Sequence, residues 1–99
     1  MKFEHDPKKS AINKLKHGIT QEDVQELWRV PAVEMPAKSI NETRYMIVGK
    51  IQGKFYSCVY TMRGENIRLI SARRSREFEE KIYYDYVKEK QNQSHPIRC

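Results

Sequence analysis

Cysteine is scarce in this sequence, and its two cysteines are not spaced for metal or disulfide chemistry. Cys58 lies inside a run of alternating apolar residues and Cys99 is the last residue, with no CxxC motif and no Cys/His cluster. This pattern argues against a disulfide framework and against a structural zinc site. We therefore expect neither a metal ion nor a cofactor.

Long apolar runs are also missing. No stretch approaches the roughly 20 residues of a membrane span, and the opening MKFEHDPKK lacks the apolar segment of a signal peptide. These absences predict a cytoplasmic protein with no membrane partner. P-loop, GxGxxG, HExxH and nucleophile-elbow motifs are absent as well, which argues against the corresponding nucleotide-binding, metalloprotease and hydrolase classes.

Charge, in contrast, is abundant and unevenly placed, with a formal net charge of +6. Residues 1–18 hold five lysines against two acids, residues 20–42 hold five acids against two bases, and residues 63–76 hold five arginines against one acid. Two basic segments around an acidic middle are typical of a protein that presents one face to a polyanion such as nucleic acid. A plain solvated surface is the alternative interpretation of the same pattern.

The N-terminal third predicts two helices after a short initial strand. Asp6-Pro7 has the form of an N-cap and first helical residue, and Gly18 supplies a left-handed C-terminal residue. Thr20 with Asp23 resembles a capping box that opens the second helix. The apolar residues expected to face the core from these helices are Ala11, Ile12, Leu15, Val24, Leu27 and Trp28.

The remainder predicts a strand meander and a final helix. Residues 44–51 and 54–62 alternate with period two around Gln52-Gly53, which indicates a β-hairpin, and a third strand follows at residues 67–73. A short edge strand is expected over residues 33–35. In the final helix we expect Ser75 as the cap and an inward stripe of Phe78, Ile82 and Tyr86, widened by Tyr83 and Val87.

These elements define one α+β domain over residues 1–90, followed by a polar tail over residues 91–99. The predicted fold is a small antiparallel meander of three to four strands, with two N-terminal helices and one C-terminal helix.

Arg73 and Arg74 close the third predicted strand, just before the final helix. Strict alternation places Arg73 on the same face as Leu69 and Arg74 on the other face, so the two guanidiniums point apart. Arginine binds phosphate through two parallel hydrogen bonds, and a strand end holds it rigidly. The alternative is an ordinary surface ion pair with Glu79 or Glu80.

The sequence is also compatible with a metal-free phosphodiester cleavage, in which a ribose 2′-hydroxyl attacks its own phosphate. That reaction needs a base, cationic stabilisation of the phosphorane and an acid for the leaving oxygen. The candidate catalytic residues are Arg73, Arg74, His17, Glu22 and Tyr83, and the candidate RNA-binding residues are Lys16, Lys50, Lys54, Arg63 and Arg68.

Two segments resemble a known family. FEHDPKKSAINKLKHGIT, at residues 3–20, resembles the opening F-E-W-D-x-x-K-x-x-x-N-x-x-K-H-G of the BrnT toxins of bacterial type II toxin-antitoxin systems, and IRLISARRSREFEEKIYY, at residues 67–84, resembles their R-I-I-S-A-R followed by an acidic helix and a tyrosine. His5 replaces the motif tryptophan, and Gln21 replaces an aromatic residue. Carried over by position, motif residues include Lys16, His17, Arg68, Ser71, Arg73 and Glu80.

The resemblance implies a RelE-like fold and a metal-independent ribonuclease that halts translation and growth. It also implies a BrnA-type antitoxin with a ribbon-helix-helix domain, so that operator DNA is contacted only through the toxin-antitoxin complex. Two other classes remain open on the residues alone: a non-catalytic nucleic-acid-binding or interaction module, and a decayed toxin that acts as a co-repressor.

Overall fold

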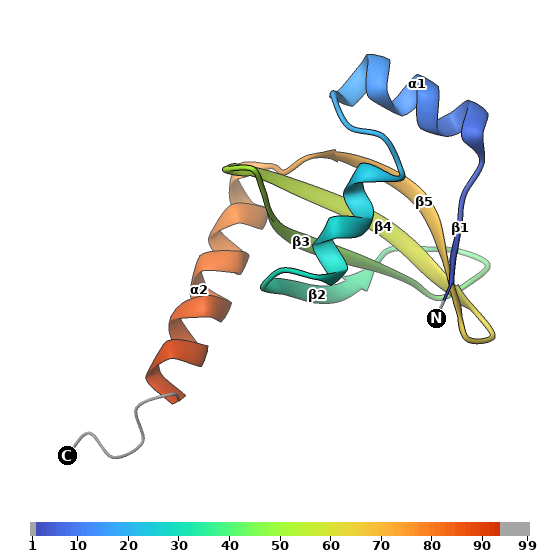
Figure 1. The fold of residues 1–99 in the computed structure, drawn as a ribbon. Helices are drawn as coiled ribbons and strands as arrows, with labels where there is room; N and C mark the ends of the chain where they lie inside the picture. The colour runs from blue at the N-terminus through green and yellow to red at the C-terminus, as the bar shows by residue number, and fades with distance from the viewer. Residues whose placement is uncertain (1, 94–99) are drawn as a thin grey trace.

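A computed structural model describes residues 2–93 and arranges them as a sheet with helical elements on both faces (Figure 1). In chain order the elements are β1 (Phe3–Glu4), α1 (Pro7–His17), a 3-10 helix η1 (Asp23–Trp28), β2 (Ala32–Ala37), β3 (Arg44–Ile51), β4 (Lys54–Arg63), β5 (Asn66–Arg74) and α2 (Glu77–Gln93).

The five strands pair in the order β1-β5-β4-β3-β2. The predicted meander of β3, β4 and β5 is confirmed, and β2 extends it antiparallel to β3. At the other edge β1 runs parallel to β5, with Phe3 opposite Ile67. The sheet is therefore mixed and has more strands than predicted. Phe3 packs edge-on against Trp28, with ring centroids 5.1 Å apart, which anchors β1 at this edge.

The hairpin turn follows the sequence prediction. Gln52 and Gly53 both have positive φ angles, 52° and 80°. This is the pattern of a type I′ turn, whose twist matches that of the flanking strands.

A β-bulge in β5 changes which face each residue occupies. Ser71 lies opposite Val59, whereas the neighbouring Tyr60 lies opposite Leu69, so Ile70 is an extra residue in the ladder. One inserted residue reverses the alternation of every side chain that follows it.

The predicted faces of the two arginines are therefore wrong. Beyond the bulge, Ala72 joins Leu69 in one core cluster. Arg74 follows Ala72 onto that face, while Arg73 moves to the opposite face with Arg68. The prediction that the two guanidiniums point apart is confirmed, but their sides are exchanged.

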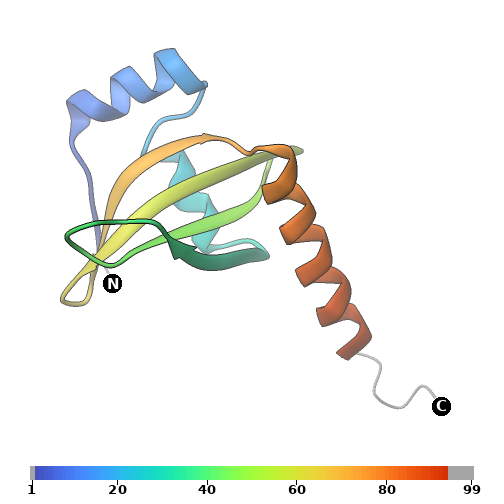
Figure 2. The same cartoon turned by 180° about the vertical axis from the view of Figure 1, so that it is seen from behind.

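Each face of the sheet has its own core. α1 and η1 cover one face, and α2 covers part of the other and then runs away from the sheet (Figures 1 and 2). The first cluster contains Ile19, Val24, Leu27, Ile47, Tyr56, Cys58, Tyr60, Ile67, Leu69 and Ala72. The second contains Val33, Val48, Phe55 and Tyr83.

Helix α1 has the predicted ends but the opposite orientation. The Asp6 carboxylate accepts a hydrogen bond from the Lys8 N–H at 2.9 Å, and Gly18 ends the helix with φ 77°. Ile12 and Leu15 nevertheless face solvent, as does Ala11, and the buried residues of the helix are Ser10 and Asn13.

The second predicted helix is a 3-10 helix of six residues. Thr20 Oγ1 accepts a hydrogen bond from the Asp23 N–H at 2.9 Å, so the predicted cap is formed. Val24 and Leu27 are fully buried, as expected. Pro31 follows shortly after the element ends, which agrees with its role as a helix breaker.

Helix α2 departs from its predicted cap. Ser75 Oγ hydrogen-bonds Ser57 Oγ at 2.7 Å instead of capping the helix. The Arg76 carbonyl accepts the first helical bond, from Glu80, and the Glu79 carboxylate reaches back to the Arg76 N–H at 2.8 Å. Glu79 thus makes one half of a capping box.

The predicted inward stripe of α2 is also wrong in part. Tyr83 is buried, and Tyr86 and Val87 pack beside it, but Phe78 and Ile82 face solvent. The side chain buried in the first turn is Glu79, because Arg73 and Ser57 supply polar partners there.

The helix continues through residues 91–93, which were expected to belong to the tail. Cys99 and the remainder of that tail lie outside the described residues. No helix within residues 2–93 is long and apolar enough to cross a membrane.

Candidate functional site

Arg73 forms an ion pair with the buried Glu79 where β5 meets α2, and its own side chain is half-buried. Its guanidinium donates to both oxygens of the Glu79 carboxylate, at 2.8 and 2.7 Å. Burial by itself would raise the pKa of Glu79, but hydrogen bonds from Arg73, the Arg76 N–H and Ser57 outweigh it and lower the pKa to about 2. The charge of Arg73 is thus neutralised within the protein.

Arg74 has a different environment on the opposite face. Its guanidinium carbon lies 5.6 Å from the centroid of the Tyr56 ring, and its Nε donates to the Phe55 carbonyl at 3.3 Å. Within the part of the chain that the structure describes, no carboxylate forms an ion pair with Arg74. Arg74 is therefore the arginine of the pair whose charge is available to a ligand.

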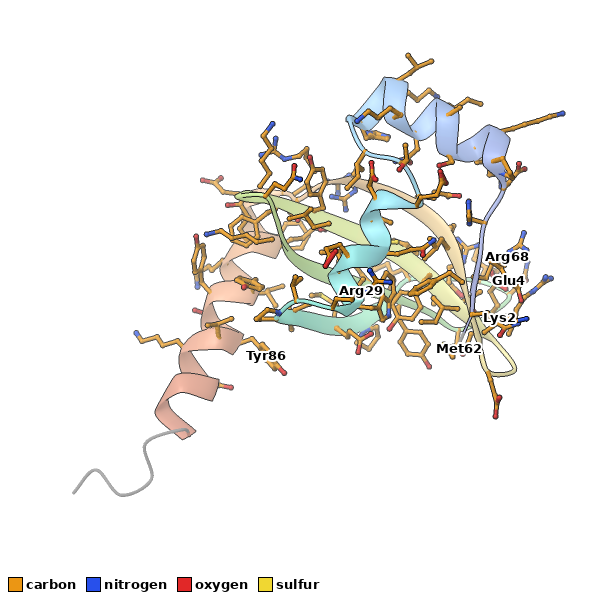
Figure 3. All side chains as sticks on the ribbon, viewed as in Figure 1. Lys2, Glu4, Arg29, Met62, Arg68 and Tyr86 are labelled. Carbon is orange, nitrogen blue, oxygen red and sulfur yellow. The ribbon has the colours of Figure 1, made fainter. Side chains whose placement is uncertain are left out.

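A groove of about 820 Å³ lies between η1 and the β3–β4 hairpin on this same face. Tyr56 lies at its wall, so the groove adjoins Arg74. Arg29, which follows η1 (Figure 3), is also one of its lining residues. The charged lining residues are Lys14, Arg29, Lys50 and Lys54 against Glu22, Asp23 and Glu26.

Glu22 is held at the rim of this groove by two side chains. Ser10 Oγ donates to Glu22 Oε1 at 2.5 Å, and His5 Nε2 lies 2.9 Å from the same oxygen. Ser10 Oγ also accepts a hydrogen bond from the Gln21 N–H at 2.9 Å. The carboxylate is thus fixed in direction while its side chain remains 56% exposed, an arrangement suited to proton transfer with a bound ligand.

The two lysines of the hairpin present their ammonium groups on opposite faces of the sheet. Lys54 opens β4 and lines the groove with an exposed side chain. Lys50 lies opposite Phe55 in the ladder, and its ammonium is 5.3 Å from the centroid of the Phe55 ring. The structure therefore brings together three of the residues predicted for function, Glu22, Lys54 and Arg74, whereas the Lys50 ammonium lies on the α2 face of the sheet with Phe55.

The remaining predicted residues do not themselves line the groove. His17 and Lys16 are exposed at the end of α1, where the following Gly18 lines the groove. Tyr83 belongs to α2, and its side chain is buried on the other face of the sheet. Its ring lies edge-on to Phe55, with ring centroids 5.1 Å apart.

Arg63 and Arg68 lie toward the β1 edge. Arg63 pairs with Glu4 at 3.6 Å, and Arg68 is exposed on β5 beside Glu4 (Figure 3). Neither residue lines the groove.

Sequence analysis missed two contributors to this site. Ser10 was overlooked because it lies on the side of α1 that the apolar pattern assigned to solvent. Tyr56 was overlooked as the support of Arg74. The signal that could have found it is the pairing of β4 with β5, which places Tyr56 opposite Arg74.

The described residues 2–93 offer neither a thiol nucleophile nor a metal site. Burial raises the pKa of the Cys58 thiol to about 12, so this residue is a core side chain and not a nucleophile. Among the described residues, no group of three or more His, Cys, Asp or Glu side chains is arranged to hold a metal ion.

The fold and the groove define a small α+β protein with a cationic strand end beside a fixed carboxylate. The family model described as the ribonuclease toxin BrnT of type II toxin-antitoxin systems matches residues 5–79. This match covers most of the chain, and the chain therefore belongs to the BrnT family. The matched segment includes the lining of the groove and both arginines, and it ends at the carboxylate that pairs with Arg73. No curated protein matches the chain significantly.

Membership in this family makes the chain a ribonuclease toxin of a type II toxin-antitoxin system, with RNA as substrate and an antitoxin as partner.

Proposed function

We propose that RNA is cut in the groove between η1 and the β3–β4 hairpin, without a metal ion, and that this cleavage halts translation and growth in the cytoplasm. The observation that carries the proposal is the position of Glu22, fixed at the rim of a groove that also holds Lys54 and adjoins Arg74, which has no ion pair within residues 2–93. These residues supply the base and the positive charge that the reaction requires.

In this mechanism the cationic residues hold the scissile phosphate. Arg74 presents its guanidinium from the Tyr56 ring, and Lys54 approaches from the hairpin. Positive charge aimed at the equatorial oxygens stabilises the phosphorane more than the starting diester. Arg73 has a structural role, because its guanidinium is already bound to Glu79.

Glu22 accepts the proton of the ribose 2′-hydroxyl, whose oxygen attacks the adjacent phosphorus. The bond from phosphorus to the 5′-oxygen breaks, and that oxygen leaves with a proton. We assign the donor role to His17, which lies at the end of α1 next to a residue of the groove lining. The products are a 2′,3′-cyclic phosphate and a 5′-hydroxyl end.

The partner in this proposal is a BrnA-type antitoxin with a ribbon-helix-helix domain. It neutralises the toxin, and the pair represses its own operon. Operator DNA is then contacted through the antitoxin complex and not by the toxin alone.

The test is incubation of the purified chain, in EDTA, with total RNA and separately with translating ribosomes. New RNA ends are mapped and examined for 2′,3′-cyclic phosphate. Arg74→Ala and Glu22→Gln are the test variants, and Arg44→Ala is the matched control because Arg44 pairs with Glu42 away from the groove.

Cyclic phosphate ends made by the wild type and Arg44→Ala, but not by the test variants, support the proposal. Intact RNA from folded wild-type protein in both reactions contradicts it and favours binding without catalysis. Equal cleavage by all variants places the reaction outside this groove.

A further inference from the structure

The outer side of α1 carries exposed apolar residues that no described part of the chain covers. Ile12 and Leu15 expose 51% and 87% of their surface. They lie one turn apart on the side of the helix opposite the buried Ser10 and Asn13. Ala11 is exposed beside them.

Polar contacts, and not these apolar residues, attach α1 to the rest of the fold. Asn13 Nδ2 donates to the Ile19 carbonyl at 2.6 Å, and Asn13 Oδ1 accepts from the Ala72 N–H at 3.4 Å. Ser10 joins the helix to Glu22. The apolar pair is therefore not needed to hold the helix in place, and a helix with this pattern normally buries its apolar side.

The charges around this surface indicate what covers it. Helix α1 contains Lys8, Lys9, Lys14 and Lys16, and none of its residues is acidic. Helical spacing places Lys8 one turn before Ile12 and Lys16 one turn after it. The surface thus combines two aliphatic side chains with a cationic border.

We propose that this surface, Lys8, Ala11, Ile12 and Leu15, is the docking site for an acidic amphipathic helix of the antitoxin. The inference rests on the proposed function for the identity of the partner. Burial of the aliphatic pair supplies affinity, and carboxylates facing the lysines supply orientation and a faster encounter.

The same features argue against other occupants. RNA binds through phosphates and base edges and gains little from two aliphatic side chains. A second copy of this chain would bring lysines against lysines, because a twofold interface uses the same surface twice.

The experiment uses isothermal titration calorimetry to measure binding of the full chain to the purified ribbon-helix-helix antitoxin that the proposed function assigns to it as partner. The test variant is Ile12→Glu/Leu15→Glu, and Lys8→Glu probes the charged border. Ile40→Glu is the matched control, because Ile40 is 98% exposed but lies in the loop between β2 and β3. Circular dichroism verifies folding, and RNA cleavage without antitoxin is measured for every variant.

We expect the double variant to weaken binding by roughly tenfold or more, as for interface hot spots, while Ile40→Glu binds as the wild type and all variants still cut RNA. Unchanged binding by the double variant, with cleavage intact, overturns the docking surface and leaves the proposed function standing. Lost cleavage with unchanged binding assigns the surface to RNA and also overturns the inference. A wild type that cuts RNA but does not bind the probe overturns both the surface and its partner, whereas a wild type that cuts no RNA contradicts the proposed function itself.

Discussion

The guanidinium of Arg73 donates two hydrogen bonds to the carboxylate of Glu79, at 2.8 and 2.7 Å, across the junction of β5 and α2. Ser57 and the Arg76 N–H donate to the same carboxylate. One buried acid therefore joins two strands to the start of the final helix and fixes the strand end from which Arg74 projects.

The first prediction concerns the pH dependence of stability. The pKa of Glu79 is lowered from 4.5 to about 2 in the folded protein, so its contribution is complete above pH 4.5 and is lost as the pH falls toward 2. We expect Glu79→Gln to lower the free energy of unfolding at pH 7 by about 3 kcal/mol. The difference from the wild type should shrink as the pH falls below 4.5.

Urea unfolding at a series of pH values measures this difference, and Glu80→Gln is the control from the next position of the same helix. A gap between wild type and Glu79→Gln that stays constant down to pH 2 would show that the pKa of Glu79 is the same in the folded and unfolded states, which contradicts the prediction.

The second prediction separates the two neighbouring arginines. Arg74→Ala removes the guanidinium that forms no ion pair within residues 2–93, and we expect RNA cleavage to fall on the order of 100-fold with nearly unchanged stability. Arg73→Ala leaves Glu79 buried without its main partner, and we expect a stability loss of about 3 kcal/mol or more. Thermal unfolding and initial cleavage rates are measured on the same preparations. The assignment is wrong if Arg73→Ala is stable and inactive while Arg74→Ala remains active.

The local elements of this fold are predictable from sequence because their causes are local. Gln52-Gly53 forms its turn from the backbone preferences of two residues, and Asp6 and Gly18 set the ends of α1 in the same way. The predictions that were wrong depend on contacts between residues far apart in the sequence. The bulge at Ile70 depends on how β5 meets β4, and it exchanged the faces of Arg73 and Arg74.

The predicted orientation of α1 is wrong for a related reason. Its apolar pattern correctly indicated a helix, but the partners of Asn13 are the Ile19 carbonyl and the Ala72 N–H, and the second lies far away in sequence. Only the tertiary fold shows that the hydrogen bonds of Asn13 hold the inner side of α1 against the rest of the protein. The same limit applies to the site. The sequence indicated Glu22 and the basic residues as candidates, but it could not show which of them meet at one groove.

The third prediction tests the proton acceptor. Glu22→Gln keeps an oxygen that accepts the hydrogen bond from Ser10 but cannot take a proton. We expect the turnover number to fall by roughly 100-fold or more with little change in KM. Single-turnover cleavage of a short RNA gives both values. Asp23→Asn, the neighbouring acid of the groove lining, is the control. Equal losses in both variants would indicate a general electrostatic effect and not proton transfer at Glu22.

The last prediction concerns the wall of the groove. A Cβ added at Gly49 would lie 3.0 Å from Leu27 Cδ2 and 3.2 Å from both Ala32 Cβ and the Pro31 carbonyl. Gly49 thus allows η1 to approach β3, and Gly49→Ala forces the two apart. We expect a stability loss of roughly 1–3 kcal/mol, as for other overpacked sites, and weaker RNA binding because the groove widens.

A double-mutant cycle with Leu27→Ala checks this cause, since Leu27 makes the closest of the three contacts. If the contact is responsible, Gly49→Ala should cost less stability in the Leu27→Ala background than in the wild type. Strict additivity of the two losses would place the strain at the Pro31 carbonyl or at Ala32. Because that backbone leads directly from η1 into β2, it would still couple the glycine to the position of the groove wall.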